Sequence, residues 1–247
     1  MIEGPVLEGG YQVWRARQGD VEVRFTGRGD LGREVERAEV LRRIEPEAPP
    51  VAWAKQIHSA RALPAQPGAC GEGDALFSEA SGLALSVITA DCVPILLAGS
   101  RGLAAVHAGW RGIVGGVVPA TLATAGGDGW TAWIGPAIGA CCYEVGSDVA
   151  EQVAAVSGPE VVVPGPAGKP HLDLVAAVRR QLSAAGVEEI RSVADCTRCD
   201  SERLYSYRRE GKGAGRNMAF IWRSSQPAWP GLRADPARMP EAGRTPR

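Results

Sequence analysis

The spacing of apolar residues near the N-terminus predicts a strand followed by a helix. Val21, Val23 and Phe25 alternate with polar residues, which is typical of a strand with one buried face. The glycines between positions 27 and 32 predict a turn after this strand, and Pro46 is expected to end the helix that follows. The buried face of that helix would hold the residues at helical spacing, which are Leu31, Val35, Ala38, Leu41 and Arg42.

Apolar runs farther along the chain predict further strands, separated by helices. The strands are expected at 51–57, 83–89, 94–98, 103–107, 130–134, 189–193 and 218–222. Helices are expected at 113–124, closed by Gly126 and Gly127, and at 145–156. Asp173 is a good N-cap for another helix, which Gly186 would terminate. This mixture of strands and helices predicts an α/β fold.

Composition indicates one globular domain. The chain has 247 residues, of which 45% are hydrophobic and 22% charged, an ordinary balance for a protein with a substantial core. We assign residues 1–223 to this domain. Residues 224–247 are rich in proline and arginine and have no apolar period, so we expect a flexible tail.

Charge and targeting signals restrict the partners and the compartment. The formal net charge of −1 gives no basic excess of the kind that nucleic acids or anionic membranes attract. The N-terminus does not resemble a secretory signal, and the sequence has no apolar run long enough to span a bilayer. We therefore expect a cytoplasmic protein whose six cysteines are free thiols or metal ligands.

Three candidate metal ligands stand at the ends of predicted strands. His58, Cys92 and His107 each close or follow an apolar run, so the fold could bring them to one cleft. A thiolate and two imidazoles suit Zn²⁺ with a fourth position open. Thirty-three residues separate His58 from Cys92 and fourteen separate Cys92 from His107, far more than in zinc fingers. A buried free cysteine and two locally bonded histidines would equally explain the spacing.

Several polar residues are candidates for substrate contacts. Arg111 could hold a phosphate because its forked guanidinium matches paired oxygens, and Gln56 could bind a base or ribose through its amide. Asp91 could either transfer protons or support the site from behind. Three further arginines, Arg208, Arg209 and Arg216, could bind anions or form a solvated basic loop.

The other cysteines form two sequence pairs. Cys196 and Cys199 have Cys-x-x-Cys spacing, and Cys141 and Cys142 are adjacent. Together they could make a second metal site with four cysteine ligands. Such sites normally combine two Cys-x-x-Cys pairs, and this chain has one. We therefore do not predict a second site. We expect His171 to orient the helix start at Asp173.

The sequences of several motifs, and their order along the chain, resemble those of the YfiH family. Its members are also described as laccase-domain proteins, polyphenol oxidases or purine nucleoside phosphorylases. The match extends from about Val51 to Trp222. It rests on Lys55-Gln56-Ile57-His58, Gly73-Asp74-Ala75-Leu76, Ala90-Asp91-Cys92-Val93-Pro94, Val106-His107-Ala108-Gly109-Trp110-Arg111-Gly112, Ile134-Gly135-Pro136, Cys142-Tyr143-Glu144-Val145, His171-Leu172-Asp173-Leu174, Cys196-Thr197, Tyr205-Ser206-Tyr207-Arg208-Arg209 and Gly215-Arg216-Asn217. The segments around Cys92 and His107 are the most specific.

The resemblance implies a single-domain αββα layered sandwich with mixed sheets, of the YfiH/CNF type. It also implies that His58, Cys92 and His107 hold a catalytic Zn²⁺. The expected substrates are phosphate and a purine nucleoside, namely adenosine, inosine or S-methyl-5′-thioadenosine, with adenosine deamination as a further activity. The sequence does not indicate the oligomeric state.

Three other functions rank below this one. In a Cys/His amidase, Cys92 would be the nucleophile and His107 the base, with a role in editing peptidoglycan precursors, which is also attributed to this family. Copper-dependent polyphenol oxidation would need several copper centres, and the three histidines of the chain cannot supply them. A non-catalytic binding module would leave the Cys/His/His set unexplained.

Overall fold

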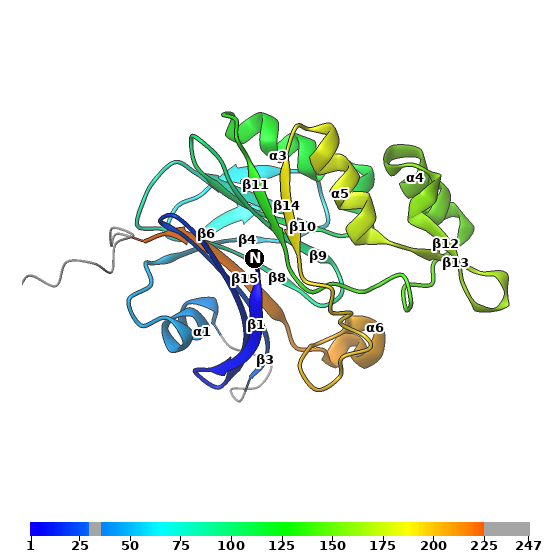
Figure 1. Ribbon diagram of the computed structural model, residues 1–247, viewed down its shortest axis with the longest axis horizontal. Coiled ribbons are helices and arrows are strands. Elements are labelled where there is room, and N and C mark those ends of the chain that lie inside the picture. Colours follow the sequence, from blue (N-terminus) through cyan, green and yellow to red (C-terminus); the bar gives the residue numbers. More distant parts are fainter. Residues whose placement is uncertain (30–35, 225–247) are drawn as a thin grey trace, which may run out of the picture.

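Two mixed β-sheets pack face to face, and helices cover the outer face of each sheet (Figure 1). The computed structural model describes residues 1–29 and 36–224. The first sheet has seven strands in the order β1-β2-β3-β15-β8-β4-β6. Its strands are β1 (Glu3–Glu8), β2 (Tyr11–Gln18), β3 (Val21–Gly29), β15 (Asn217–Arg223), β8 (Ala84–Thr89), β4 (Val51–Lys55) and β6 (Gly68–Glu72).

The second sheet has six strands in the order β14-β11-β9-β10-β7-β5. They are β14 (Glu189–Ser192), β11 (Thr131–Ile134), β9 (Val93–Ala98), β10 (Leu103–Ala108), β7 (Ala75–Ser78) and β5 (Ala62–Pro64). A small third sheet pairs β12 (Val162–Pro164) with β13 (Pro170–Leu172). Both large sheets contain parallel and antiparallel pairs. For example, β4 and β8 are parallel in the first sheet, and β9 and β10 are antiparallel in the second.

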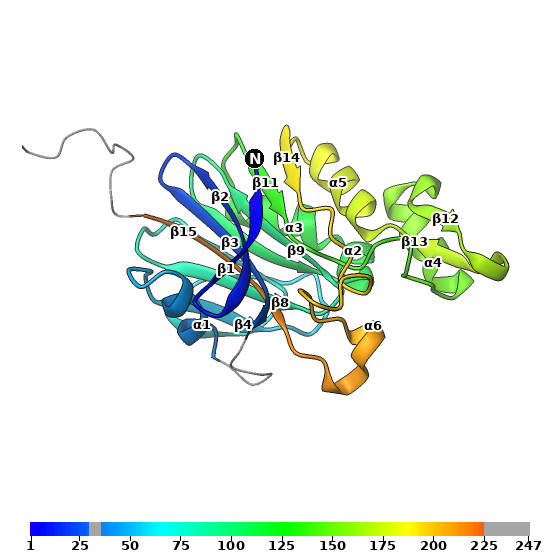
Figure 2. The same ribbon diagram turned by 60° about the horizontal axis from the view of Figure 1, so that its bottom comes forward.

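The helices are short and unequally divided between the outer faces. Helix α1 (Arg37–Ile44) lies against the first sheet, and α3 and α5 lie against the second (Figures 1 and 2). The α-helices after α1 are α2 (Trp110–Val114), α3 (Val117–Ala125), α4 (Ser147–Ser157), α5 (Leu174–Ala184) and α6 (Tyr207–Glu210). Single 3₁₀ turns occur at Pro159–Val161, Pro166–Gly168 and Gly211–Gly213.

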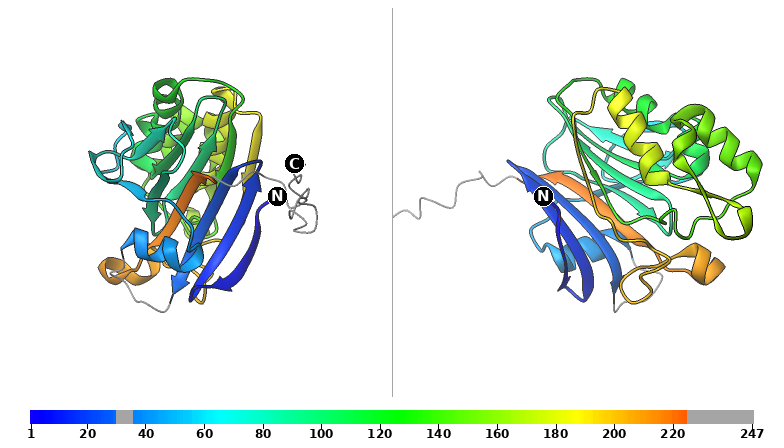
Figure 3. Two further views of the ribbon diagram at one scale, coloured as in Figure 1. Left: turned by 90° about the vertical axis from the view of Figure 1, so that its left-hand side faces the viewer. Right: turned by 45° about the vertical axis from the view of Figure 1, so that its right-hand side comes forward.

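Side chains of the second sheet fill two different core layers. In β9, Ile95 and Leu97 face the helices, whereas Leu96 faces the first sheet, as alternation along a strand requires. Trp133 and Phe25 meet in the layer between the sheets and are almost completely buried. The second sheet is therefore covered on both faces, which explains why its central strands are continuous apolar runs. The αββα prediction is confirmed (Figure 3).

Several sequence predictions need correction. The helix predicted at 113–124 is two helices, because Gly115 and Gly116 intervene and Gly116 adopts a φ of 76°. Gly27 and Gly29 belong to β3 rather than to a turn. A side chain at Gly27 would collide with the carbonyl oxygen of Arg203, so close backbone packing explains this glycine.

Parts of other predictions fall outside the described residues. The predicted positions Leu31 and Val35 of the first helix lie there, as does the predicted tail beyond Ser224. Asp173 caps α5 as predicted, accepting a 2.8 Å hydrogen bond from the backbone N–H of Ala176. Among residues 1–29 and 36–224, none of the helices combines the length and the apolar character needed to span a bilayer.

Candidate active site

The predicted metal ligands meet at the junction between the two sheets. His58 follows β4 of the first sheet, and His107 lies on β10 of the second. Cys92 lies in the short connection that leaves β8 of the first sheet and enters β9 of the second. The ligand atoms of the three residues lie within 4.8 Å of one another, so this group could bind a metal ion. The Sγ atom of Cys92 is 3.9 Å from Nε2 of His58.

Unusual backbone conformations occur on both sides of this group. His58 has a φ of 61° and Asp91 a φ of 98°, and within the described part of the chain they are the two non-glycine residues with positive φ. Such conformations persist where surrounding contacts fix them and are frequent at functional sites. In this chain they occur in the segments after β4 and β8, which supply His58 and Cys92 to the same group.

Asp91 is fixed by hydrogen bonds behind the candidate ligands. Its buried carboxylate accepts hydrogen bonds from the Thr197 hydroxyl and from the Arg208 backbone N–H, both at 2.6 Å. Its carbonyl oxygen accepts a further bond of 2.9 Å from the N–H of Ile138. Both carboxylate oxygens are thus engaged in structural contacts. Of the two roles considered for Asp91, these contacts favour support of the site over proton transfer.

Asp74 organises the site, although the sequence analysis assigned it no role. Its carboxylate accepts hydrogen bonds from the backbone N–H groups of Ile57, His58 and Ser59 at 3.2, 2.9 and 2.6 Å. The Ser59 hydroxyl donates another, and Nδ1 of His107 lies 2.8 Å from the same carboxylate. One buried anion therefore holds the loop that carries His58 and the ring of His107. The motif Gly73-Asp74-Ala75-Leu76 was the signal in the sequence that could have identified Asp74.

The three ionisable groups perturb one another in the metal-free protein. Burial would raise the pKa of Asp74, but hydrogen bonds from His107 and Ser59 hold it well below its usual range. Burial would lower the pKa of His107, yet Asp74 and Cys92 raise it to about 9. Burial would raise the pKa of the Cys92 thiol, but its contacts with His107 and His58 lower that pKa to about 7. A thiolate near neutral pH suits metal binding.

The residues fit a three-ligand metal site in which the Asp74 carboxylate holds the ring of His107 from behind. Because ionised Asp74 accepts from Nδ1–H of His107, it leaves Nε2 of that ring as the ligand atom. Gly109 supplies the space beside the ligands. A Cβ atom there would lie 3.0 Å from the Cys92 sulfur and 3.0 Å from a ring carbon of His58.

The group opens into a cavity of about 660 Å³ with a marked excess of positive charge. Among the described residues that line it, Asp91 is the one carboxylate, whereas five side chains are basic: Arg37, Lys55, Arg111, Arg208 and Arg216. Arg111 is exposed, and its guanidinium carbon lies 4.3 Å from the centre of the Trp110 ring. Tyr143 and Tyr207 add aromatic surface. Such a cavity can bind an anionic ligand together with a flat ring.

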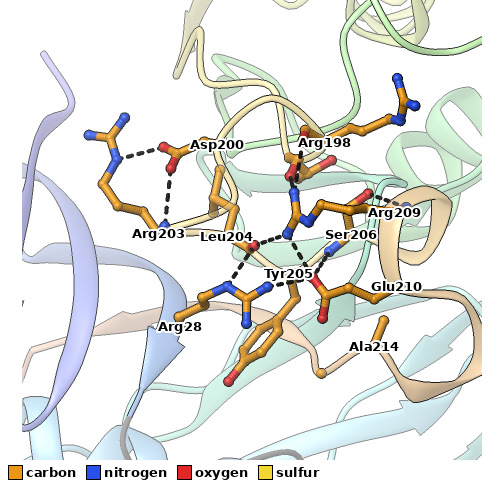
Figure 4. A network of polar contacts seen from close by, with 12 residues as sticks. Arg28, Arg198, Asp200, Arg203, Leu204, Tyr205, Ser206, Arg209, Glu210 and Ala214 are labelled. Atoms are coloured by element: carbon orange, nitrogen blue, oxygen red, sulfur yellow. Dashed lines mark hydrogen bonds and ion pairs between the residues drawn. The ribbon is translucent and has the colours of Figure 1, made fainter.

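Two other candidates for ligand contacts are engaged elsewhere. Gln56 lines the cavity, but its amide is paired with the backbone of Ile88 through bonds of 2.7 and 2.9 Å. Its proposed role as a substrate contact stays a prediction. Arg209 is not among the cavity-lining residues. Its guanidinium bonds to the carbonyl oxygens of Thr197, Arg198 and Leu204 and to the Glu210 carboxylate (Figure 4).

His171 differs from its sequence prediction, and most of the remaining cysteines lie together. Nδ1 of His171 lies 2.6 Å from the carbonyl oxygen of Ala140, so this ring contacts the segment before α4 rather than the start of α5. Five cysteines lie outside the group of His58, Cys92 and His107, called here the strand-end site. Four of them lie together, since the sulfur atoms of Cys141, Cys142, Cys196 and Cys199 are all within 4.8 Å of one another. The fold thus brings together the four cysteines that the sequence offered as a conceivable second metal site.

Comparison with known proteins places these features in a family. The family model described as multi-copper polyphenol oxidoreductase laccase matches residues 27–224. The purine nucleoside phosphorylase YfiH of Escherichia coli (strain K12) is 37% identical over 177 residues, covering 69% of this chain and 72% of the relative. Adenosine deaminase RL5, from an unknown prokaryotic organism, is 42% identical over 162 residues, covering 61% and 62% of the two chains.

A solved structure agrees with the fold. The crystal structure of Neisseria meningitidis protein NMB0706 superposes with a TM-score of 0.74 at 28% sequence identity, covering 87% of this chain and 99% of that one. The segment matched by the family model contains the whole second sheet together with His58, Cys92 and His107, whereas β1 and β2 of the first sheet precede it. From the extent of these matches, the chain belongs to the laccase-like YfiH family.

Proposed function

We propose that this chain is a zinc-dependent purine nucleoside phosphorylase of the cytoplasm, acting on adenosine, inosine and S-methyl-5′-thioadenosine. One observation carries the proposal: the His58, Cys92 and His107 group opens into a cavity lined by five basic side chains and several aromatic rings. The name of the Escherichia coli relative, a purine nucleoside phosphorylase, supports the same activity.

The basic side chains would bind the phosphate. In phosphorolysis a phosphate oxygen bonds to the ribose C1′ atom as the bond from C1′ to the purine breaks, and the departing purine takes a proton. The attacking phosphate needs charge compensation and a fixed position. Arg111 meets both needs, because its guanidinium can donate two parallel hydrogen bonds and lies at the cavity surface. Arg208 and Arg216 would add positive charge.

The aromatic residues would hold the purine. Trp110, Tyr143 and Tyr207 present ring surfaces to the cavity, against which a base can stack. Burial raises the pKa of Tyr143 to about 12, and the nearby Cys92 sulfur acts in the same direction, so its hydroxyl stays protonated. This hydroxyl can therefore donate a hydrogen bond to a ring nitrogen of the base.

His58, Cys92 and His107 would hold the zinc ion. A soft thiolate with two imidazoles suits Zn²⁺, and three protein ligands leave a position for water or substrate. When bound, zinc supplies Lewis acidity and lowers the pKa of a coordinated water. Asp74 would fix the tautomer and orientation of His107, while Gly109 keeps the space beside the ligands clear.

Adenosine deamination is a second candidate activity. It replaces the amino group at C6 of adenine by an oxygen from water and releases ammonia. The adenosine deaminase RL5 is 42% identical to this chain over 162 residues, which favours including this reaction. Both reactions need a bound purine nucleoside, and they differ in whether phosphate is consumed.

Amidase activity is the alternative from a different chemical class. Metal-free Cys92, with its lowered pKa and its contact with His107, would resemble a Cys/His nucleophile. Zinc bound to the same thiolate would suppress that reactivity. The two functions therefore predict opposite responses to metal removal.

Product identification tests the proposal directly. Metal-quantified protein is incubated with adenosine, with and without phosphate, and the products are separated by chromatography. We expect adenine and ribose 1-phosphate when phosphate is present. Inosine formed without phosphate would identify deamination. If neither pair of products forms, a nucleoside enzyme is the wrong assignment.

A further inference from the structure

The four clustered cysteines come from two segments that strand pairing brings side by side. Strands β11 and β14 pair in parallel, and the chain leaves both strands in the same direction. The pairing continues beyond the strands as a bridge between Ala137 and Cys196, with a 3.0 Å hydrogen bond from the N–H of Thr197 to the carbonyl of Ala137. The segment that contains Cys141 and Cys142 therefore faces the Cys-x-x-Cys loop, although more than fifty positions separate them in sequence.

Three of the sulfur atoms are spaced as in a tetrahedral tetrathiolate site, and the fourth, of Cys196, lies within 4.8 Å of them. The Sγ atom of Cys199 lies 3.4 Å from that of Cys142 and 3.6 Å from that of Cys141, and the Cys141 and Cys142 sulfurs are 3.7 Å apart. Four sulfurs around one Zn²⁺ at about 2.3 Å would be separated by roughly 3.8 Å. A disulfide would instead need about 2.05 Å between two of them.

Hydrogen-bond donors surround the cluster, as thiolate ligands require. The backbone N–H of Gly139 donates to the Cys196 sulfur at 3.2 Å, and the backbone of Arg198 and Cys199 lies close to the same sulfur. The positive charge of Arg198 is close enough to interact with Cys142 and Cys199. Four thiolates around Zn²⁺ carry a net charge of −2, which these donors and the arginine would offset.

We propose that Cys141, Cys142, Cys196 and Cys199 bind a second Zn²⁺ with a structural role. Four protein ligands leave no open position for chemistry. The ion would join two segments that both supply the active-site cavity, since Tyr143 directly follows Cys142 and Arg208 lies beyond the Cys-x-x-Cys loop.

This loop is also braced against the candidate active site. Arg209 binds the carbonyl oxygens of Thr197 and Arg198 (Figure 4), and the Thr197 hydroxyl donates to Asp91, the residue before Cys92. The second zinc would therefore stabilise the side of the cavity that holds Asp91 and the backbone of Arg208.

Zinc stoichiometry tests the second site. Elemental analysis of the full-length protein, purified without added chelator, should find two zinc ions per chain. The double substitution Cys196→Ser/Cys199→Ser should remove one, and so should Cys92→Ala at the strand-end site. Cys70→Ser is the matched control, because Cys70 belongs to neither cluster, and it should keep both ions. One zinc in the wild type, unchanged by the double substitution, would overturn the proposal.

A second measurement does not depend on the folding of the double variant. X-ray absorption of the zinc that remains in Cys92→Ala should show sulfur neighbours alone, at about 2.3 Å. Titration of the denatured, chelated wild type should find six free thiols. A mixed nitrogen and sulfur shell, or four free thiols because of a disulfide, would contradict the proposal. These readouts do not involve nucleoside turnover, so the second site and the proposed enzymatic function can fail separately.

Discussion

The Asp74 carboxylate lies 2.8 Å from Nδ1 of His107 and is almost completely buried. The same carboxylate binds the backbone around His58, so one side chain sets the positions of two of the three candidate ligands. A carboxylate behind a histidine ligand fixes the tautomer of the ring and increases its basicity. Asp74 is therefore a positioning residue for the candidate metal ligands.

Replacement of Asp74 by asparagine should weaken metal binding. The amide cannot accept the same set of N–H donors, so both His58 and His107 lose their orientation. We expect zinc affinity to fall by about 10- to 100-fold, the range typical of such outer-shell partners, measured by competition with a chromogenic chelator. Glu79→Gln, which removes an exposed carboxylate paired with Arg101, is the control and should leave affinity unchanged. If Asp74→Asn binds zinc with the same affinity as the wild type and Glu79→Gln, Asp74 has no role in metal binding.

Replacement of Arg111 by lysine should impair the use of phosphate. Lysine keeps the charge but cannot donate two parallel hydrogen bonds. Because a hydrogen bond to a charged group contributes about 1.5–3 kcal/mol, the KM for phosphate should rise roughly tenfold or more, with zinc content unchanged. Arg101→Lys, at an exposed ion pair, is the matched control. A wild-type phosphate KM in Arg111→Lys would mean that this arginine does not hold the anion.

Alkylation of the metal-free protein should reveal the lowered pKa of Cys92. The thiolate is the reactive form, and its contacts with His107 and His58 lower the pKa to about 7. The rate of reaction with iodoacetamide at Cys92, followed by peptide mass spectrometry, should therefore rise with pH through about 7 and then level off. In His107→Ala the midpoint should move to higher pH, because the first contact that stabilises the thiolate is lost. An unchanged midpoint would refute this contact as the cause.

Addition of a single methyl group at Gly109 should disturb the ligands. The new Cβ atom would lie 3.0 Å from the Cys92 sulfur and from His58, closer than ordinary contact. We expect Gly109→Ala to lose most of its zinc at the strand-end site while the far-ultraviolet circular dichroism stays native. The cysteine cluster would be unaffected, so total zinc should fall by about half. Full retention of zinc would show that the ligands can move without loss of binding.

The sequence predicted the central strands well because both faces of the second sheet are covered. The runs that became β9 and β10 are apolar at nearly every position, and such runs have few alternatives to a buried strand. By contrast, β1 is mostly exposed and has no alternation to detect. The break at Gly115 and Gly116 depends on backbone conformation, which a pattern of small apolar residues does not reveal.

The residues of the site could be predicted where they belong to a specific sequence motif. They could not be predicted where only the pairing of distant strands brings them together. His58, Cys92 and His107 were identified from motif resemblance, and the fold brings them together as expected. The four-cysteine cluster was missed because its two halves approach only through the parallel pairing of β11 and β14. Asp74 had a visible motif, but its five hydrogen bonds to four residues could not be deduced without coordinates.

The dependence of nucleoside turnover on zinc tests the central claim most directly. Wild-type protein is stripped by a chelator, assayed with adenosine and phosphate, and then titrated with zinc while metal content is measured, with Cys92→Ala treated in parallel. We predict that turnover disappears on stripping and returns as the strand-end site is filled, whereas Cys92→Ala stays inactive at every zinc concentration. Phosphorolysis that survives complete zinc removal, or amidase activity that appears with it, would contradict the account.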